Sequence, residues 1–375
     1  MNHVCLVSDQ AMPNFLPVLN AEVRPDTVTL VVSNKMRSRA QWLREAMVCQ
    51  QVKVLDDIDV GDAQNDIVAV EDRLLEWAIA HEAVLNDSVL NVTGGTKPMA
   101  IAAQKVFLSV ARPIFYVDIN TDNLIWFSGE NRGLTVSLKN QPTLRQYFAL
   151  NGITSSGDFR SVVENDKWRH FYGEIAANVQ KWSQSIRALN YLARLAEEKH
   201  SLAFDPRSNQ MNLTNWTEFI KLLYTDELVA NAQGGRVKRF VSEEARRFCN
   251  GIWLEHLVFE TLKKFGFDSK RALMNVKIVD GRGNSNELDA VVLHKNTCYV
   301  IEDKTKNLKS NGSADAAVYK LAQLSSKMGL RARGILVSAI GVRPADKDRA
   351  RDYGVTVIDW LPSLESELRL ALGIR

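Results

Sequence analysis

Two charged tripeptides, Glu287-Leu288-Asp289 and Glu302-Asp303-Lys304, restrict the fold of this chain more than any other feature, because each lies in a strand-like run. We expect the runs Glu287–Leu293 and Cys298–Thr305 to form a hairpin that turns at Lys295-Asn296. Asp289 then faces Glu302, with Cβ atoms about 4.5–5.5 Å apart. The period of two of a β-strand also puts Asp289, Glu302 and Lys304 on one face of the sheet.

A solvated surface with a Glu287–Lys304 ion pair is the alternative reading of these charges. Against it, Val291 shares the face of Asp289, while Leu288 and Val292 occupy the other. A strand that is apolar on both faces is central, and charges there are costly unless they are paired or bind a metal. Two carboxylates at this spacing repel each other unless a cation lies between them. Oxygen ligands favour Mg²⁺ or Mn²⁺.

Glu255 is the third acid that the pattern singles out. Within the expected helix Ser242–Phe265 it falls in line with apolar side chains at helical spacing, namely Phe248, Ile252, Phe259 and Leu262. An acid inside an apolar stripe is either bound to a partner or part of a site. Beside the hairpin, we expect Glu255 to belong to the same centre as Asp289 and Glu302.

Residues 240–340 resemble the PD-(D/E)xK nuclease superfamily, whose core runs helix, three strands, helix, strand. The matching elements are the helix Ser242–Phe265, the strands Leu273–Val279, Glu287–Leu293 and Cys298–Thr305, the helix Ala314–Met328 and the strand Gly334–Ala339. Asp289 matches the first acid of the superfamily, Glu302-Asp303-Lys304 its ExK tripeptide, and Glu255 the additional helical Glu of some branches. Leu288 stands where the superfamily usually has Pro.

This resemblance implies roles for the matched residues. Asp289 and Glu302 would bind the metal together with the carbonyl of Asp303, and Lys304 would orient the attacking water and offset charge on the phosphate. Lys320 and Gln323, in the following helix, are further candidates for phosphate contact.

Residues 1–140 alternate β-branched runs with amphipathic segments. The runs are Val4–Ser8, Val28–Ser33, Val89–Thr93 and Pro113–Val117, and the segments are Arg37–Cys49, Ile67–Leu85 and Pro98–Val110. Strands that alternate with helices predict a doubly wound α/β domain with a parallel sheet. Such sheets bind ligands at the carboxyl ends of their strands, near the switch point.

The turn Thr93-Gly94-Gly95-Thr96-Lys97 follows a predicted strand and opens a predicted helix. Its glycines allow a ligand to approach the backbone, and the helix amino end with Lys97 favours a phosphate. It is neither a Walker motif nor a dinucleotide fingerprint. On physical grounds alone, a tight structural turn capped by Thr96 explains it equally well.

This turn, with the first strand ending in Leu6–Gln10, resembles the ligand turn of CRISPR-associated Rossmann-fold sensor domains, the CARF family. The resemblance implies a homodimer that binds cyclic oligoadenylate, with cyclic tetra-adenylate expected, across its twofold axis. The implied ligand residues are Ser8, Gln10, Asn34, Thr93, Gly94, Gly95, Thr96 and Lys97. The domain order of sensor, connector and nuclease is similar to that of the cyclic-oligoadenylate-activated nucleases of type III CRISPR systems.

The expected domains are a sensor at 1–140, a linker and helical connector at 141–240, and a nuclease domain with a restriction-endonuclease-like fold at 241–375. Polar, glycine-containing sequence at Pro142–Gly157 indicates a linker. Helical patterns follow at Trp168–Glu198 and Trp216–Ala232 and end at Gly234-Gly235. Either a helical connector or a winged-helix module fits them.

Composition excludes several classes of protein. With 46% hydrophobic and 24% charged residues, the chain is typical of globular proteins. Its four scattered cysteines show no zinc spacing, and neither a signal peptide nor a membrane-length apolar run is visible, so we expect a cytoplasmic protein. Residues 236–375 carry 25 Lys and Arg against 17 Asp and Glu, whereas the first 235 carry 22 against 27. A basic C-terminal part suits a nucleic-acid substrate.

The sequence therefore predicts an Mg²⁺- or Mn²⁺-dependent nuclease that hydrolyses phosphodiesters of single-stranded DNA and RNA, with nicking of duplex DNA as a further activity. We expect cyclic oligoadenylate to activate it in CRISPR antiviral defence. Two alternatives remain open. One is a ligand-sensing transcription regulator with an inactive C-terminal domain, and the other is a restriction or repair nuclease without second-messenger control.

Overall fold

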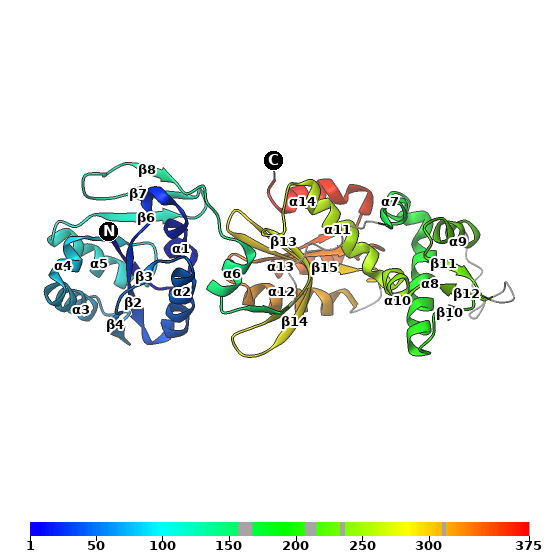
Figure 1. Cartoon of the computed structure of the whole chain (residues 1–375), viewed down its shortest axis with the longest axis horizontal. Coiled ribbons are helices and arrows are strands. Elements are labelled where there is room, and N and C mark those ends of the chain that lie inside the picture. The colour runs from blue at the N-terminus through cyan, green and yellow to red at the C-terminus, as the bar shows by residue number, and fades with distance from the viewer. Residues whose placement is uncertain (157–166, 207–214, 233–236, 310–312, 375) are drawn as a thin grey trace.

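The computed structural model describes residues 1–156, 167–206, 215–232, 237–309 and 313–374. The chain forms three parts in a row (Figure 1). The N-terminal domain lies at one end, the C-terminal domain lies in the middle, and the part built from residues 167–240 lies at the far end. The middle segment of the sequence is therefore an end of the molecule in space.

The N-terminal domain is built on a mainly parallel sheet with strand order β3-β2-β1-β5-β6-β7-β8, with β4 paired to β2. Its strands are β1 (Asn2–Leu6), β2 (Thr27–Ser33), β3 (Lys53–Val54), β4 (Ile58–Gly61), β5 (Ser88–Asn91), β6 (Ile114–Asp118), β7 (Asn123–Trp126) and β8 (Thr135–Ser137). Strands β7 and β8 are antiparallel additions at one edge. The predicted doubly wound α/β fold is confirmed.

Helices cover both faces of this sheet. The helices are α1 (Met12–Leu19), α2 (Arg37–Cys49), α3 (Ile67–Ala80), α4 (Glu82–Asn86) and α5 (Lys97–Ser109). Phe15 of α1 and Leu43 of α2 belong to one apolar core, and Leu74 of α3 and Phe107 of α5 belong to the core on the other face. The single helix predicted for Ile67–Leu85 is wrong, since the chain breaks at His81 between α3 and α4.

The predicted linker at Pro142–Gly157 is wrong for the residues that the structure describes, which exclude Gly157. Helix α6 (Leu144–Leu150) is opened by a capping box in which Thr143 and Gln146 bond each other's backbone. Tyr147 and Phe148 are buried in the core. Strand β9 (Thr154–Ser156) then pairs with β13 and joins the sheet of the C-terminal domain, whereas α6 packs against α2 of the N-terminal domain.

The C-terminal domain has a six-stranded sheet with order β17-β16-β15-β14-β13-β9. Its remaining strands are β13 (Ala272–Val279), β14 (Ser285–His294), β15 (Thr297–Lys304), β16 (Arg333–Ser338) and β17 (Val355–Ile358). Lys295 and Asn296 have φ of 46° and 58°, so they form the two-residue turn that matches the twist of a hairpin. The pairs run from His294 with Thr297 to Ala290 with Ile301, which confirms the predicted register over these residues; the ladder ends one pair short of the predicted Asp289–Glu302 pair.

The two faces of this sheet are covered by different helices. Helix α11 (Trp253–Lys264) packs on one face, while α12 (Ser313–Lys327) connects β15 to β16 and packs on the other. Helices α13 (Pro344–Asp352) and α14 (Leu364–Ala371) complete the domain.

The predicted helix Ser242–Phe265 is divided into α10 (Glu243–Arg247), a π-helical turn Phe248–Ile252 and α11. Leu288 joins the core of the α12 face, contrary to its predicted grouping with Val292.

Residues 167–240 form a small module with its own three-stranded sheet, ordered β10-β12-β11. Its elements are α7 (Arg169–Ala177), α8 (Val179–Glu198), β10 (Ala203–Phe204), α9 (Trp216–Thr225), β11 (Val229–Asn231) and β12 (Lys238–Phe240). The order from α8 to β12, with the first strand paired to the last, is that of a winged helix. The predicted helix Trp216–Ala232 is wrong at its end, where β11 begins, and Trp168–Glu198 is broken at Asn178. Gly234-Gly235 lies outside the described residues.

Two continuous apolar cores hold the three parts together. One contains Phe15 of the N-terminal domain, Tyr147 of α6 and Val300 of β15. The other contains Trp182 of α8 and Ile301 of β15. The central sheet therefore shares one core with the N-terminal domain and the other with the winged-helix module. Within the described residues, no helix combines the length and the apolar character needed to cross a membrane.

Candidate active site and ligand-binding edge

The charged tripeptides meet at the end of the β14–β15 hairpin. The Nζ of Lys304 lies 2.5 Å from Oε1 of Glu302, 3.2 Å from the carbonyl oxygen of Asp303 and 3.8 Å from Oδ2 of Asp289. The backbone N–H of Asp303 donates to Oδ2 of Asp289 over 2.8 Å. The predicted carboxylates and lysine are thus brought together, largely screened from solvent, with side-chain exposures of 20%, 5% and 22% for Asp289, Glu302 and Lys304.

The positively charged Lys304 ammonium lies among the oxygens where the sequence predicts a metal ion. The three oxygens around it come from Asp289, Glu302 and the Asp303 carbonyl, which are the groups that the sequence predicts as metal ligands. Hard oxygen donors of this kind fit Mg²⁺ or Mn²⁺. Within the described residues, no three His, Cys, Asp or Glu side chains gather closely enough to hold a metal by themselves. The oxygens around the Lys304 ammonium are thus two carboxylate oxygens and one carbonyl oxygen.

Mutual repulsion and burial set the protonation of this cluster. Burial raises the pKa of Asp289, and the nearby Glu302 carboxylate raises it further. Burial alone would lower the pKa of Lys304, but the Glu302 and Asp289 carboxylates raise it above its usual value. Lys304 therefore stays charged and balances the acids. Lys320 of α12 adds a second positive charge 3.6 Å from Glu302, whereas Gln323 is exposed on the same helix.

Glu255 and the side chain of Asp303 form a second, buried pair of acids next to this cluster. Burial and the Asp289 charge raise the pKa of Glu255 to about 8. Burial, Asp289 and Glu255 raise the pKa of Asp303 well above its usual value. Both carboxylate oxygens of Asp303 and Oε2 of Glu255 have no hydrogen-bond partner among the described residues. The sequence predicted Glu255 but assigned Asp303 only a carbonyl, although the strand period already turned its side chain to the α11 face.

The π-helical turn before α11 brings Glu255 to the hairpin. Gly251 has φ of 124°, and a Cβ there would lie 2.7 Å from Oγ1 of Thr305. Asn190 of α8 donates to the same Oγ1 over 3.0 Å. Sequence reasoning missed Asn190, Gly251 and Thr305, because only the packed structure places α8 beside the residue that follows Lys304.

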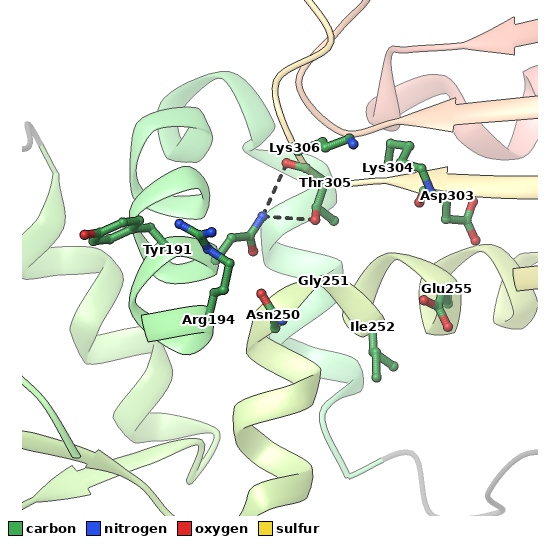
Figure 2. Close-up of a pocket in the computed structure, with 11 residues that line it drawn as sticks. Tyr191, Arg194, Asn250, Gly251, Ile252, Glu255, Asp303, Lys304, Thr305 and Lys306 are labelled. Carbon is green, nitrogen blue, oxygen red and sulfur yellow. Dashed lines mark hydrogen bonds between the residues drawn. The ribbon is translucent and has the colours of Figure 1, made fainter. Parts of the chain in front are cut away.

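A pocket of about 560 Å³ opens between α8, the π-helical turn and the end of β15 (Figure 2). Glu255, Asp303 and Lys304 line one side, and Tyr191 and Arg194 of α8 line the other. Of the candidate site residues, Glu255, Asp303 and Lys304 thus line a cleft between the winged-helix module and the C-terminal domain, whereas Asp289 and Glu302 are not among its lining residues.

The predicted ligand residues lie at the carboxyl ends of three neighbouring strands of the N-terminal sheet. Ser8 and Gln10 follow β1, Asn34 follows β2, and the glycine turn follows β5. Strand β1 pairs with β2 on one side and β5 on the other, which makes this edge a topological switch point. Lys97, the first residue of α5, is exposed there.

Close packing explains both glycines of the turn. A Cβ on Gly94 would meet the Leu6 carbonyl oxygen at 1.9 Å, and Gly95 has φ of 72°. Thr96 is the N-cap of α5 and accepts from the N–H of Met99. The turn therefore places the N-terminus of α5 directly beside the end of β1.

Several predicted ligand residues have structural partners for their side chains; besides Thr96, these are Ser8, Asn34 and Thr93. The hydroxyl of Thr93 accepts from the N–H of Val117 and donates to Asn91, both over 2.7 Å. The side-chain oxygen of Asn34 accepts from Arg37 over 2.8 Å. The sequence also missed the buried pair Asn14 and Asn91, which fixes α1 against the ends of β1 and β5.

Comparison with protein families assigns both ends of the chain. Residues 2–147 match the model of the Card1 CARF domain. Residues 242–370 match the model of the Card1-like endonuclease domain. No curated protein sequence matches the chain.

Three solved structures are similar over nearly the whole chain. Protein VC1899 from Vibrio cholerae has a TM-score of 0.88 and 25% identity, covering 100% of this chain and 98% of that one. Can2 from Sulfobacillus thermosulfidooxidans, solved in complex with cyclic tetra-adenylate, has a TM-score of 0.79 and 25% identity, covering 99% and 97%. A type III CRISPR defence DNA nuclease activated by cyclic oligoadenylate shares the fold, with a TM-score of 0.55 and 18% identity over 98% of this chain and 51% of that one.

Proposed function

We propose that this chain, which joins a Card1 CARF domain to a Card1-like endonuclease domain, is a divalent-metal-dependent nuclease activated by a cyclic oligoadenylate in type III CRISPR defence. The observation that carries the proposal is the Lys304 ammonium enclosed by Asp289, Glu302 and the Asp303 carbonyl. That arrangement lies in the part of the chain that matches the endonuclease domain.

The site residues have distinct roles in the proposed hydrolysis. Asp289, Glu302 and the Asp303 carbonyl would hold a Mg²⁺ or Mn²⁺ ion, and a bound ion of this kind acts as a Lewis acid and lowers the pKa of a bound water. Lys304 would donate hydrogen bonds to the attacking water and to the phosphate. Its raised pKa keeps it charged, so it also offsets the negative charge that grows on the phosphate.

The activator site is the edge formed by the ends of β1, β2 and β5. The N-terminus of α5 and Lys97 favour phosphate groups there, and Gly94 and Gly95 let α5 begin directly beside the end of β1. The similar Can2 structure contains cyclic tetra-adenylate, which supports this ring as the activator. A cyclic tetra-adenylate can have twofold symmetry, so we propose a homodimer in which each subunit offers the same turn to the ring.

The proposed substrate is single-stranded DNA or RNA, cut with little sequence preference. The excess of Lys and Arg in residues 236–375 predicts binding that weakens with salt through counterion release. Nicking of duplex DNA belongs to the same proposal.

One cleavage experiment tests the proposal. The purified protein is incubated with labelled single-stranded DNA, single-stranded RNA or plasmid, with Mn²⁺ or Mg²⁺, and with or without cyclic tetra-adenylate. We expect cleavage only when both metal and activator are present, and loss of cleavage with EDTA. In Lys97→Ala, the activation curve should shift to higher activator concentration while the maximal rate is kept. Full wild-type cleavage without activator, or none with both additions, would contradict the proposal.

The two alternative functions have less support. The winged-helix topology of residues 167–240 favours a transcription regulator, but the exposed charges of α9 are one acid, Glu218, and one base, Lys221. Glu218 is also paired with Lys181. A helix without net positive charge is poorly suited to bind DNA phosphates. A restriction or repair nuclease without second-messenger control would not need the β1–β5 edge, and activator-independent cleavage is the result that would favour it.

A further inference from the structure

The cleft beside the candidate active site has one side that belongs to the winged-helix module. Tyr191 and Arg194 of α8 line this pocket of about 560 Å³ on the side away from Asp303 and Lys304, and the Tyr191 hydroxyl points away from those two residues (Figure 2). The module therefore supplies surface to a site whose acids and lysine all come from another domain.

Helix α8 is fixed at this position by specific contacts. The side-chain amide of Asn190 donates to Oγ1 of Thr305 over 3.0 Å, and Thr305 directly follows Lys304. Gly251 packs against the same Thr305 so closely that a Cβ would lie 2.7 Å from its Oγ1. Tyr191 and Arg194 therefore keep a defined place relative to Lys304 and do not depend on a mobile loop.

The chemistry of these two residues suits a nucleotide. The Arg194 side chain is 60% exposed and has one weak ion pair, with Glu198 at 3.4 Å. Its guanidinium lies 5.7 Å from the ring centre of Tyr191. An aromatic ring combined with arginine is the usual combination for binding single strands, because any base stacks on the ring and the guanidinium binds a phosphate.

A second pocket extends the positive surface along the same helix. It has a volume of about 440 Å³ and is lined by Arg187 of α8 and by Lys309, which lies beyond the end of β15. Arg187 and Arg194 are seven residues apart, which is about two turns or 10 Å along one face of the helix. Lys306 is exposed and lines the first pocket. In the sequence it lies between Lys304, which lines the first pocket, and Lys309, which lines the second.

We propose that α8 of the winged-helix module forms one side of the substrate cleft, with Tyr191 stacking on a base next to the cleaved bond and Arg194 binding an adjacent phosphate. The strand would continue past Arg187 toward the second pocket. This inference rests on the proposed nuclease function. It gives the module a role in substrate binding that does not involve its helix α9.

The test uses the full-length protein with Mn²⁺, saturating cyclic tetra-adenylate and a labelled single-stranded oligonucleotide. The variants are Arg194→Ala, Arg194→Lys, Tyr191→Leu and Tyr191→Phe. Lys199→Ala is the matched control, because it removes one positive charge from the end of the same helix outside both pockets. The rate is measured against substrate concentration. Binding is measured in an Asp289→Asn background at several salt concentrations.

We expect Arg194→Ala and Tyr191→Leu to raise KM by about tenfold with little change in kcat, since each removes a contact to the bound strand and none to the reacting atoms. Arg194→Ala should also reduce the slope of log affinity against log salt by about 0.7. Tyr191→Phe, which keeps the ring, and Lys199→Ala should match the wild type. Arg194→Lys should recover part of the affinity, which separates a charge contact from a folding defect.

Two contrary results have different meanings. If the wild type cleaves but Arg194→Ala and Tyr191→Leu keep its KM and salt slope, α8 is only a structural support and this inference is wrong. If the wild type does not cleave any of the substrates, the proposed nuclease function itself is wrong.

Discussion

At the scale of single residues, the central question is whether the Asp289, Glu302 and Lys304 cluster performs the chemistry. We expect Asp289→Asn or Lys304→Ala to lower the cleavage rate by at least about a hundredfold, because each removes a charge that the transition state requires. The double variant should be little worse than either single one, since the residues act together. Cleavage rates with Mn²⁺ and activator are the measurement.

The matched control for this prediction is Glu287→Gln. Glu287 is an exposed carboxylate on the same strand, two residues from Asp289, and its cross-strand neighbour is Lys277. Its substitution should leave cleavage near the wild-type rate. An active Asp289→Asn variant, or an inactive Glu287→Gln variant, would show that the site has been assigned to the wrong carboxylates.

His3 predicts a pH dependence of stability that is independent of the active site. It is fully buried in β1 against Phe115, and burial, helped by the N-terminal ammonium, lowers its pKa to about 3. A histidine whose pKa is depressed in the folded state makes its full contribution to stability at a pH above its unfolded-state pKa of about 6.5. That contribution is lost progressively as the pH falls below this value. From pH 7.5 to pH 5 the loss should be about 2 kcal/mol.

Chemical denaturation of wild type and His3→Leu at both pH values measures this effect. Other groups titrate in both proteins, so the informative quantity is the difference between them. The wild type should lose more stability than His3→Leu as the pH falls. Parallel pH profiles for the two proteins would show that His3 gains a proton in the folded state without cost.

At the scale of elements, the π-helical turn before α11 sets the geometry of the site. Gly251→Ala should destabilise the protein and lower the cleavage rate at least tenfold, because its Cβ would displace Thr305 next to Lys304. Gly266→Ala is a matched control with φ of 85° but no atom within 4 Å of the added Cβ. It should cost only the left-handed strain, about 1–2 kcal/mol, with cleavage kept.

Thermal unfolding and cleavage rates of the two glycine variants give the answer. If Gly251→Ala cleaves as fast as Gly266→Ala, Thr305 moves without disturbing Lys304, and the turn does not position the site. The comparison holds whatever the substrate is, because both variants are assayed on the same oligonucleotide.

At the scale of the whole molecule, the N-terminal domain contacts the endonuclease domain directly, and we expect the proposed activator to act through that contact. Residues 167–240 lie at the end of the molecule that is far from the N-terminal domain (Figure 1). The turn between β6 and β7 instead contacts the endonuclease domain. Arg331 donates to Asn120 over 2.8 Å, and Asn296 of the hairpin turn donates to Asp122 over 2.5 Å.

We expect Arg331→Ala to reduce the stimulation of cleavage by cyclic tetra-adenylate several-fold, since allosteric coupling is typically worth about 1–3 kcal/mol. Activator binding, measured by calorimetry, should change little. Arg351→Ala is the control, because Arg351 is 79% exposed and pairs within α13. Stimulation that is equal in Arg331→Ala and Arg351→Ala would exclude this contact from the route.

Residue types and short-range periodicity were enough to predict much of this protein. Alternating runs in residues 1–140 predicted the doubly wound sheet, and the Lys295-Asn296 turn with its flanking strands predicted the hairpin register. That register follows from two local rules, since strand side chains alternate and a two-residue turn fixes the pairing. The meeting of Asp289, Glu302 and Lys304 could therefore be predicted without a tertiary structure.

Contacts between distant segments were decided only by the tertiary structure. The polar segment before residue 157 looked like a linker, yet α6 packs against α2 of the N-terminal domain and β9 completes the sheet of the endonuclease domain. Trp216–Ala232 looked helical throughout, but its end pairs with β12. Neither the place of α8 beside Thr305 nor the burial of the Asp303 side chain against Glu255 leaves a local pattern. Both arise because the burial of apolar surface brings distant segments together. The sequence of one apolar segment does not specify which other segment will cover it.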